Sequence, residues 1–262
     1  MQTELMGTPL FYVTRGLEEP GIPVLFLHGW GCTHEVFSPL MEALSLPEIA
    51  MDFPGHGESG EPATPWGIPE YAEQVLQLLD FLGVPRVRIV AHSFGGRVAL
   101  WLSSHAPERV ERMVLTGAAG IRPPQSEKKT KALKGYQFAQ KTLNQVKKVG
   151  VLTDSVEKLQ QKLFEKHASP DYVKLSPSMR ETFKLVINRD LSPLLPQIAA
   201  PTLLVWGTAD TETPLWMGEK MEKEIPDAAL IPFENRSHFA FAEEPLRFQL
   251  IVKAFFEEEK SA

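Results

Sequence analysis

The chain has 262 residues, of which 43% are hydrophobic and 23% charged, with a formal net charge of −6. This composition is typical of a globular protein, and the acidic balance argues against a nucleic-acid-binding protein. Cys32 is the single cysteine, so no intrachain disulfide is possible and a reducing compartment is expected. The N-terminus lacks a signal-peptide pattern and no apolar run has the length of a membrane span, so we expect a cytoplasmic protein.

The first half of the chain alternates short apolar runs with amphipathic helical patterns. The run at 24–28 is wholly apolar before its histidine, as in strands buried on both faces of a sheet. The clearest helix, 69–82, has Pro69 in its first turn and Gly83 at its end. In chain order the patterns predict strands at 10–14, 24–28, 48–52, 87–91 and 111–116, with helices at 37–46, 69–82 and from the segment after 95 to about 106.

The alternation stops between residues 121 and 190. This segment is polar, has a helical pattern and contains no convincing strand. Its basic first thirty residues have two interpretations, a patch that attracts an anionic substrate or partner and an ordinary solvated helix surface, and we favour the second.

The strand–helix pattern then resumes, with strands expected at 202–206 and 229–233 and helices at 215–225 and 245–258. Strands that alternate with helices at this spacing predict a parallel sheet covered on both faces. Residues 121–190 are therefore an insertion into a single α/β domain formed by residues 1–120 and 191–262.

Residues 91–95, Ala-His-Ser-Phe-Gly, connect the strand at 87–91 to the next helix. They match the G-x-S-x-G nucleophile elbow with Ala91 in place of the first glycine. A serine on such a tight turn forces its neighbours into close backbone contact, so the flanking residues, including Gly95, carry little bulk. Ser93 is the predicted nucleophile, at a helix N-terminus whose free N–H groups face developing negative charge.

A serine nucleophile needs a base within hydrogen-bond reach and a carboxylate that orients the base. Functional groups gather at the carboxyl ends of parallel strands. His238 follows the last predicted strand, and Asp210 lies four residues after the preceding one. The chain order nucleophile, acid, base is that of this type of fold. Other histidines fit less well: His105 lies on the helix after the elbow, His167 in the insertion, and His92 beside Ser93 on a strand whose successive side chains point oppositely.

A tetrahedral intermediate also needs N–H donors for its oxyanion. One is expected from Phe94, which follows the nucleophile. The second is expected from Trp30, in the loop after the strand at 24–28. Gly29 allows this loop to come close, and His28 is expected to support the loop and not to transfer protons.

The dispersed motifs together resemble the α/β-hydrolase-fold superfamily, in particular serine hydrolases with a helical cap, of the carboxylesterase or C–C hydrolase kind. The residues that carry the resemblance are His-Gly-Trp-Gly at 28–31, Asp-Phe-Pro-Gly-His-Gly-Glu-Ser at 52–59, Ala-His-Ser-Phe-Gly-Gly at 91–96, Asp210 after Val-Trp-Gly, and Ser237 with His238. The resemblance implies a mostly parallel sheet with helices on both faces and a helical cap at 121–190. Apolar cap residues such as Phe183 and Leu185 either line a pocket or pack the cap onto the core, and we favour packing.

We therefore predict a serine hydrolase that cleaves a small, largely apolar ester through an acyl-enzyme. Ser93 argues against the haloalkane dehalogenases and epoxide hydrolases, which need an aspartate at the elbow. Hydrolysis of a C–C bond of the meta-cleavage-product kind, of a lactone or of a thioester remains open, as does a non-catalytic small-molecule receptor on the same fold. We expect no metal or organic cofactor, a small-molecule substrate, and no nucleic-acid or membrane partner. The sequence leaves open whether the protein is a monomer or a homodimer.

Overall fold

A computed structural model describes most of the chain, namely residues 1–122, 172 and 175–257. The chain divides into two compact units, one of residues 1–122 with 181–262 and one of residues 123–180. The elements below belong to the first unit, apart from the first turn of α7. The predicted cap at 121–190 lies largely outside the described residues and stays a prediction.

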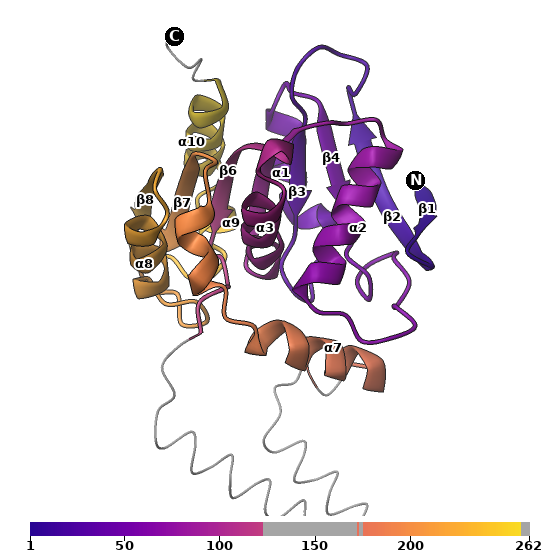
Figure 1. Ribbon diagram of the computed structural model, residues 1–262. Helices are drawn as coiled ribbons and strands as arrows, with labels where there is room; N and C mark the ends of the chain where they lie inside the picture. Colours follow the sequence, from indigo (N-terminus) through magenta and orange to yellow (C-terminus); the bar gives the residue numbers. More distant parts are fainter. Residues whose placement is uncertain (123–171, 173–174, 258–262) are drawn as a thin grey trace, which may run out of the picture. The chain divides into compact units, whose positions relative to one another are not determined.

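In the described part of the chain, the strands form an eight-stranded sheet in the order β1-β2-β4-β3-β5-β6-β7-β8 (Figure 1). The β1–β2 and β2–β4 pairs are antiparallel and the other pairs are parallel. This confirms the mostly parallel sheet, although β1 was not predicted. The strands are β1 (Gln2–Leu5), β2 (Thr8–Arg15), β3 (Val24–Leu27), β4 (Glu48–Met51), β5 (Val87–His92), β6 (Val110–Thr116), β7 (Thr202–Gly207) and β8 (Ala228–Phe233).

Two apolar clusters, one on each face of the sheet, hold the helices in place. Leu27 faces a cluster with α2, α3 and α8, whereas its neighbour Phe26 faces a cluster with α1, α9 and α10. Successive strand side chains point to opposite faces, so strands such as β3 are apolar throughout. The helices are α1 (Ser38–Ala43), α2 (Ile68–Phe81), α3 (Phe94–His105), α7 (Pro177–Asn188), α8 (Trp216–Glu224), α9 (Ala240–Glu243) and α10 (Pro245–Glu257), with 3-10 turns η1 (His34–Phe37), η2 (Pro107–Arg109) and η3 (Ser192–Gln197).

The helix predicted at 37–46 is shorter in the structure. The 3-10 turn η1 leads into α1, which ends at Ala43, and Leu44 has extended backbone angles of −87° and 132°. Pro47 disfavours helical angles at Leu46, the predicted last residue of this helix, so the helix cannot extend that far. The chain therefore leaves the helix early enough to enter β4.

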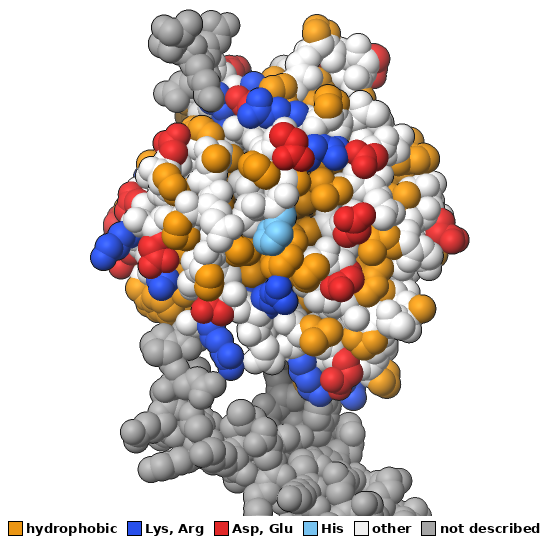
Figure 2. Space-filling view, in the orientation of Figure 1, with side chains coloured by type: hydrophobic (Ala, Val, Ile, Leu, Met, Phe, Trp, Pro, Cys, Tyr) orange, Lys and Arg blue, Asp and Glu red, His pale blue; other side chains and the backbone are white. Residues whose placement is uncertain are grey.

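Acidic and basic side chains are dispersed among apolar ones on the face shown in Figure 2, which carries α2 and α3. Among the described residues, no helix has both the length and the apolar character needed to cross a membrane.

The parallel strands β3 to β8 all end at one edge of the sheet, which we call the carboxyl edge; the opposite edge is the amino edge. The segments that leave the carboxyl edge begin at residues 28, 52, 93, 117, 208 and 234. Each predicted site residue lies on one of these segments, so the topology brings together side chains that are up to 210 positions apart in the chain.

Candidate active site

Ser93 occupies a strained turn between β5 and α3. Its backbone angles, φ 50° and ψ −110°, are in a region that residues with a side chain rarely adopt. Neighbouring segments hold the turn: Ser93 N donates to Thr116 O at 3.2 Å, and Ser93 O accepts hydrogen bonds from Gly96 N at 3.0 Å and Ala119 N at 2.9 Å. Hydrogen bonds to both the N–H and the carbonyl of Ser93 therefore stabilise its strained backbone conformation.

The glycines after Ser93 are required by close backbone contacts. A Cβ atom at Gly95 would lie 2.1 Å from Leu27 O, and one at Gly96 would lie 2.5 Å from Ala118 Cβ. Both distances are far below a van der Waals contact. The first turn of α3 therefore packs directly against the end of β3 and the segment after β6.

The structure brings Ser93, His238 and Asp210 together. The Ser93 hydroxyl donates to His238 Nε2 at 2.9 Å, and His238 Nδ1 donates to Asp210 Oδ2 at 2.8 Å. Because the carboxylate only accepts hydrogen bonds, Nδ1 carries the proton and Nε2 is free to receive one from the serine. This is the arrangement that activates a serine hydroxyl as a nucleophile.

Asp210 is held by further donors. The backbone N–H groups of Glu212 and Thr213 donate to Oδ1 at 2.8 and 2.9 Å, and the Thr213 hydroxyl lies 2.8 Å from Oδ2. Burial raises the pKa of Asp210, but these hydrogen bonds and the interaction with His238 outweigh it, and the pKa ends below its usual range. Asp210 is therefore an ionised carboxylate at neutral pH.

The two residues before His238 are held from two sides. A Cβ atom at Gly207, where β7 ends, would lie 2.2 Å from Arg236 O, so only glycine lets the loop come this close. On the other side, the backbone N–H and hydroxyl of Ser237 both donate to Glu243 of α9, and Arg236 pairs with Glu244 at 2.7 Å. His238 therefore projects from an anchored segment.

The two predicted oxyanion donors lie beside Ser93. Phe94 follows it directly, and a Cβ atom at Gly29, next to Trp30, would lie 3.3 Å from Ser93 Cβ. Within the described part of the chain, neither the Trp30 nor the Phe94 N–H donates a hydrogen bond. Both groups are thus available to an acceptor.

His28 is tied into the loop that carries Trp30. Its Nδ1 donates to Gly29 O at 2.7 Å, and its Nε2 accepts from Phe53 N at 2.9 Å. Burial, followed by repulsion from His56, lowers the pKa of His28 to about 3, so the ring is neutral. A neutral ring with both nitrogens occupied supports the loop and has no free nitrogen for proton transfer.

Aromatic rings surround the oxyanion loop. The Trp30 ring makes edge contacts with His56 at 4.8 Å, Phe183 at 5.0 Å and Phe94 at 5.3 Å between centroids. Phe183 belongs to the part of α7 that lies in the first unit, whereas the nearby Leu185 is half exposed. The surroundings of the candidate oxyanion site are therefore apolar.

Sequence reasoning missed the structural role of Asp52 in the 52–59 motif. Asp52 accepts hydrogen bonds from His34 N and Nδ1, both at 2.8 Å, and from Glu58 N at 3.0 Å. A Cβ atom at Gly57 would lie 2.1 Å from Asp52 Oδ2. The turn-rich composition of the motif was the available signal, and the carboxylate is the centre around which the turn folds.

His105 and Cys32 lie outside the hydrogen-bonded group of Ser93, His238 and Asp210. His105 is exposed and stacks on Trp101 with ring centroids 4.0 Å apart. Cys32 is half-buried, and burial raises the pKa of its thiol. No cluster of potential metal ligands occurs among the described residues.

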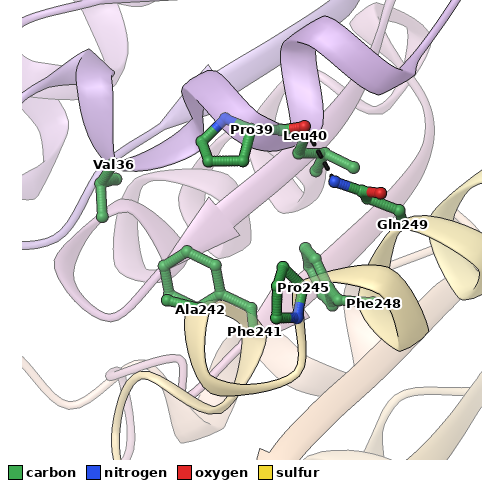
Figure 3. A pocket seen from close by; sticks show the side chains of 8 residues that line it. All are labelled: Val36, Pro39, Leu40, Phe241, Ala242, Pro245, Phe248 and Gln249. Atoms are coloured by element: carbon green, nitrogen blue, oxygen red, sulfur yellow. Dashed lines mark hydrogen bonds between the residues drawn. The ribbon is translucent and has the colours of Figure 1, made fainter.

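A separate apolar pocket of about 140 Å³ opens between two helical segments on one face of the sheet (Figure 3). Gln249 bridges its sides by donating to Pro39 O at 2.9 Å. The pocket contains none of the three hydrogen-bonded residues described above. Its lining residues are Val36, Pro39, Leu40, Phe241, Ala242, Pro245, Phe248 and Gln249.

A family model described as the alpha/beta hydrolase fold matches residues 22–245. The chain belongs to this family. A pimeloyl-[acyl-carrier protein] methyl ester esterase from Neisseria meningitidis is 28% identical over 250 residues, which cover 89% of this chain and 93% of that protein. The alpha/beta hydrolase fold predicted from the dispersed motifs is therefore confirmed.

Solved structures agree with this assignment. A hydrolase from Pseudomonas aeruginosa matches with a TM-score of 0.75 and 25% identity, and the match covers 98% of each chain. An enol-lactonase from Burkholderia xenovorans matches with a TM-score of 0.75 over 98% of this chain and 100% of that one. At 22% identity, the second likeness concerns the fold alone.

Proposed function

We propose that the protein is a serine hydrolase that cleaves small, largely apolar esters through an acyl-enzyme. The observation that carries the proposal is the continuous hydrogen-bonded chain from the Ser93 hydroxyl through His238 to Asp210. The similarity to an esterase supports the same reaction class.

Acylation begins when the Ser93 oxygen attacks the ester carbonyl carbon. His238 Nε2 takes the hydroxyl proton as the new C–O bond forms, and Asp210 stabilises the resulting imidazolium. The negative charge on the former carbonyl oxygen is accepted by the N–H groups of Trp30 and Phe94. The tetrahedral intermediate then collapses, and His238 returns the proton to the departing alcohol.

Deacylation uses the same groups. A water molecule loses a proton to His238 as its oxygen attacks the acyl carbon. The second tetrahedral intermediate releases the carboxylic acid, and the proton returns from His238 to the Ser93 oxygen. The rings of Phe94 and Phe183 beside Trp30 favour an apolar acyl group, because these two rings offer no hydrogen-bond partner to a polar one.

The first test is labelling with a fluorophosphonate probe, read by intact mass. We expect one adduct per chain on the wild type and none on Ser93→Ala or His238→Ala. Ser103→Ala and His105→Ala are matched controls, because both residues lie on α3 away from the hydrogen-bonded chain, and they should label normally. An unlabelled but folded wild type, or a labelled Ser93→Ala variant, contradicts the proposal.

The substrate class is tested with p-nitrophenyl esters, lactones and vinylogous diketones. We expect ester hydrolysis to have the highest kcat/KM. Preferential cleavage of a diketone or a lactone would replace the ester assignment by C–C bond hydrolysis or lactonase activity on the same serine. Tight binding of these compounds without turnover would favour a small-molecule receptor.

A further inference from the structure

His92 is a buried histidine next to the proposed nucleophile that the mechanism above does not use. It ends β5 and is 1% exposed. Its Nδ1 donates to Thr116 O at 3.0 Å, the same carbonyl that accepts Ser93 N at 3.2 Å. One carbonyl of β6 therefore holds both the backbone of the elbow and the ring of His92.

The His92 ring also touches two other parts of the site. Its centroid lies 4.7 Å from that of His238, with the planes tilted by 50°. A Cβ atom at Gly29 would lie 2.9 Å from His92 Cδ2, so the loop that carries Trp30 rests on the same ring. The ring of His92 therefore contacts both the proposed base and the proposed oxyanion loop.

The remaining surroundings of His92 are apolar. The rings of Phe239 and Phe241 lie 4.8 and 5.0 Å from it, and Phe241 also lines the pocket in Figure 3. Burial, followed by repulsion from His238, lowers the pKa of His92 to about 3. The ring is thus neutral at ordinary pH and does not oppose the positive charge that forms on His238 during the reaction.

We propose that His92 is a positioning residue: its ring, anchored to Thr116, supports the imidazole of His238 and the Gly29 backbone in the orientation that Ser93 requires. This inference rests on the proposed serine-hydrolase function. The sequence-based expectation considered His92 only as a candidate for the base, and set it aside because adjacent strand residues point in opposite directions. The positioning role is a different one, and it depends on the ring of His238, which approaches His92 from another loop.

Three variants of His92 distinguish the effect of its ring contacts from the effect of its hydrogen bond to Thr116. His92→Ala removes both. His92→Asn keeps an N–H group close to the position of Nδ1 but removes the ring, and His92→Phe keeps a ring but removes the donor. We expect the larger phenylalanine ring to be accommodated by an adjustment of Phe241, which contacts His92 and also lines the apolar pocket.

The measurements are the rate of fluorophosphonate labelling, kcat and KM for p-nitrophenyl butyrate, and Tm. For His92→Ala we expect kcat and the labelling rate to fall about 100-fold with KM changed less than about threefold, as for a small displacement of a reacting group. His92→Phe should recover about tenfold of the lost kcat, because the ring contact with His238 returns. His92→Asn should recover Tm without recovering kcat.

Gln74→Ala is the control for a buried side chain that donates to a carbonyl far from the site, since Gln74 bonds Leu5 O at 3.3 Å. It should lower Tm and leave kcat unchanged. A His92→Ala variant with normal kcat, or recovery of kcat by asparagine as well as by phenylalanine, overturns the positioning role. If the wild type itself is not labelled, the proposed function fails first and the role of His92 fails with it.

Discussion

The Ser93–His238–Asp210 group and Glu48 lie at opposite edges of the sheet and differ in their hydrogen bonds. At the carboxyl edge, Ser93, His238 and Asp210 form a hydrogen-bonded chain with distances of 2.9 and 2.8 Å. At the amino edge, Glu48 begins β4 fully buried, no described residue donates a hydrogen bond to its carboxyl oxygens, and Arg15 Nη1 lies 3.6 Å away. The missing hydrogen bonds of Glu48 reduce only stability, whereas a displaced group in the Ser93–His238–Asp210 chain would reduce the rate of the proposed reaction.

A second carboxylate at the amino edge, Glu111, shows that the hydrogen-bond partners, and not the edge, make the difference. Glu111 accepts hydrogen bonds from Arg88 at 2.9 Å and from Arg112 at 3.1 Å. Burial raises the pKa of Glu111, but the two arginines outweigh it and the pKa ends below its usual range. For Glu48, burial outweighs the attraction of Arg15 and raises the pKa to about 7. Hydrogen-bonded partners, and not burial alone, decide the direction of the shift.

The largest expected effect is on the rate, at the carboxyl edge. Asp210→Asn should lower kcat by about 10³–10⁴-fold, because a neutral amide stabilises neither the reactive tautomer nor the imidazolium of His238. Esterase kinetics with p-nitrophenyl butyrate measure it. Asp80→Asn is the control, since Asp80 forms an exposed ion pair with Arg109 at 2.8 Å. Similar losses of kcat in both variants would contradict the proposed role of Asp210.

The next effect concerns stability at the same edge. Gly95→Ala should lower the free energy of unfolding by roughly 3 kcal/mol, because the new methyl group overlaps Leu27 O and displaces α3 or β3. Urea denaturation measures the change. Gly67→Ala is the comparison, since a Cβ atom there would meet the flexible end of Glu70 at 3.3 Å and Pro69 Cδ at an ordinary contact distance of 3.5 Å. An equally mild effect at both glycines would contradict the close contact at the elbow.

The smallest effect is expected at the amino edge and depends on pH. Because the pKa of Glu48 is raised in the folded state, the folded protein binds more protons than the unfolded chain between about pH 4.5 and pH 7, and stability falls as the pH rises through this window. Glu48→Gln should therefore raise the free energy of unfolding at pH 8 by about 1–2 kcal/mol and change it little at pH 4.

Glu111→Gln gives the opposite sign and serves as the control. The lowered pKa of Glu111 means that its contribution is present above the unfolded pKa and is lost as the pH falls through the folded one. This variant should be destabilised at pH 8. Urea denaturation at pH 4, 6 and 8 measures both variants, and a common sign for the two would show that their environments do not differ as described.

Local sequence was sufficient for most strands and helices. The apolar runs of β3 and β7 and the one-sided pattern of α2 each specify an element without knowledge of the rest of the chain. β1 was missed because it is a four-residue edge strand with alternating exposed positions and no apolar run. β1 is extended because it pairs with β2, and its own composition does not predict a strand.

For the site, the sequence by itself determined the residue types and their places at strand ends. The elbow around Ser93 follows from small residues at a strand-to-helix turn, and the positions of Asp210 and His238 follow from the rule that functional groups collect at the carboxyl ends of parallel strands. Only the tertiary structure decided which groups meet across loops. The contact of His92 with His238, and the burial of Glu48 without a hydrogen bond, depend on packing between segments far apart in the chain, which no local pattern encodes.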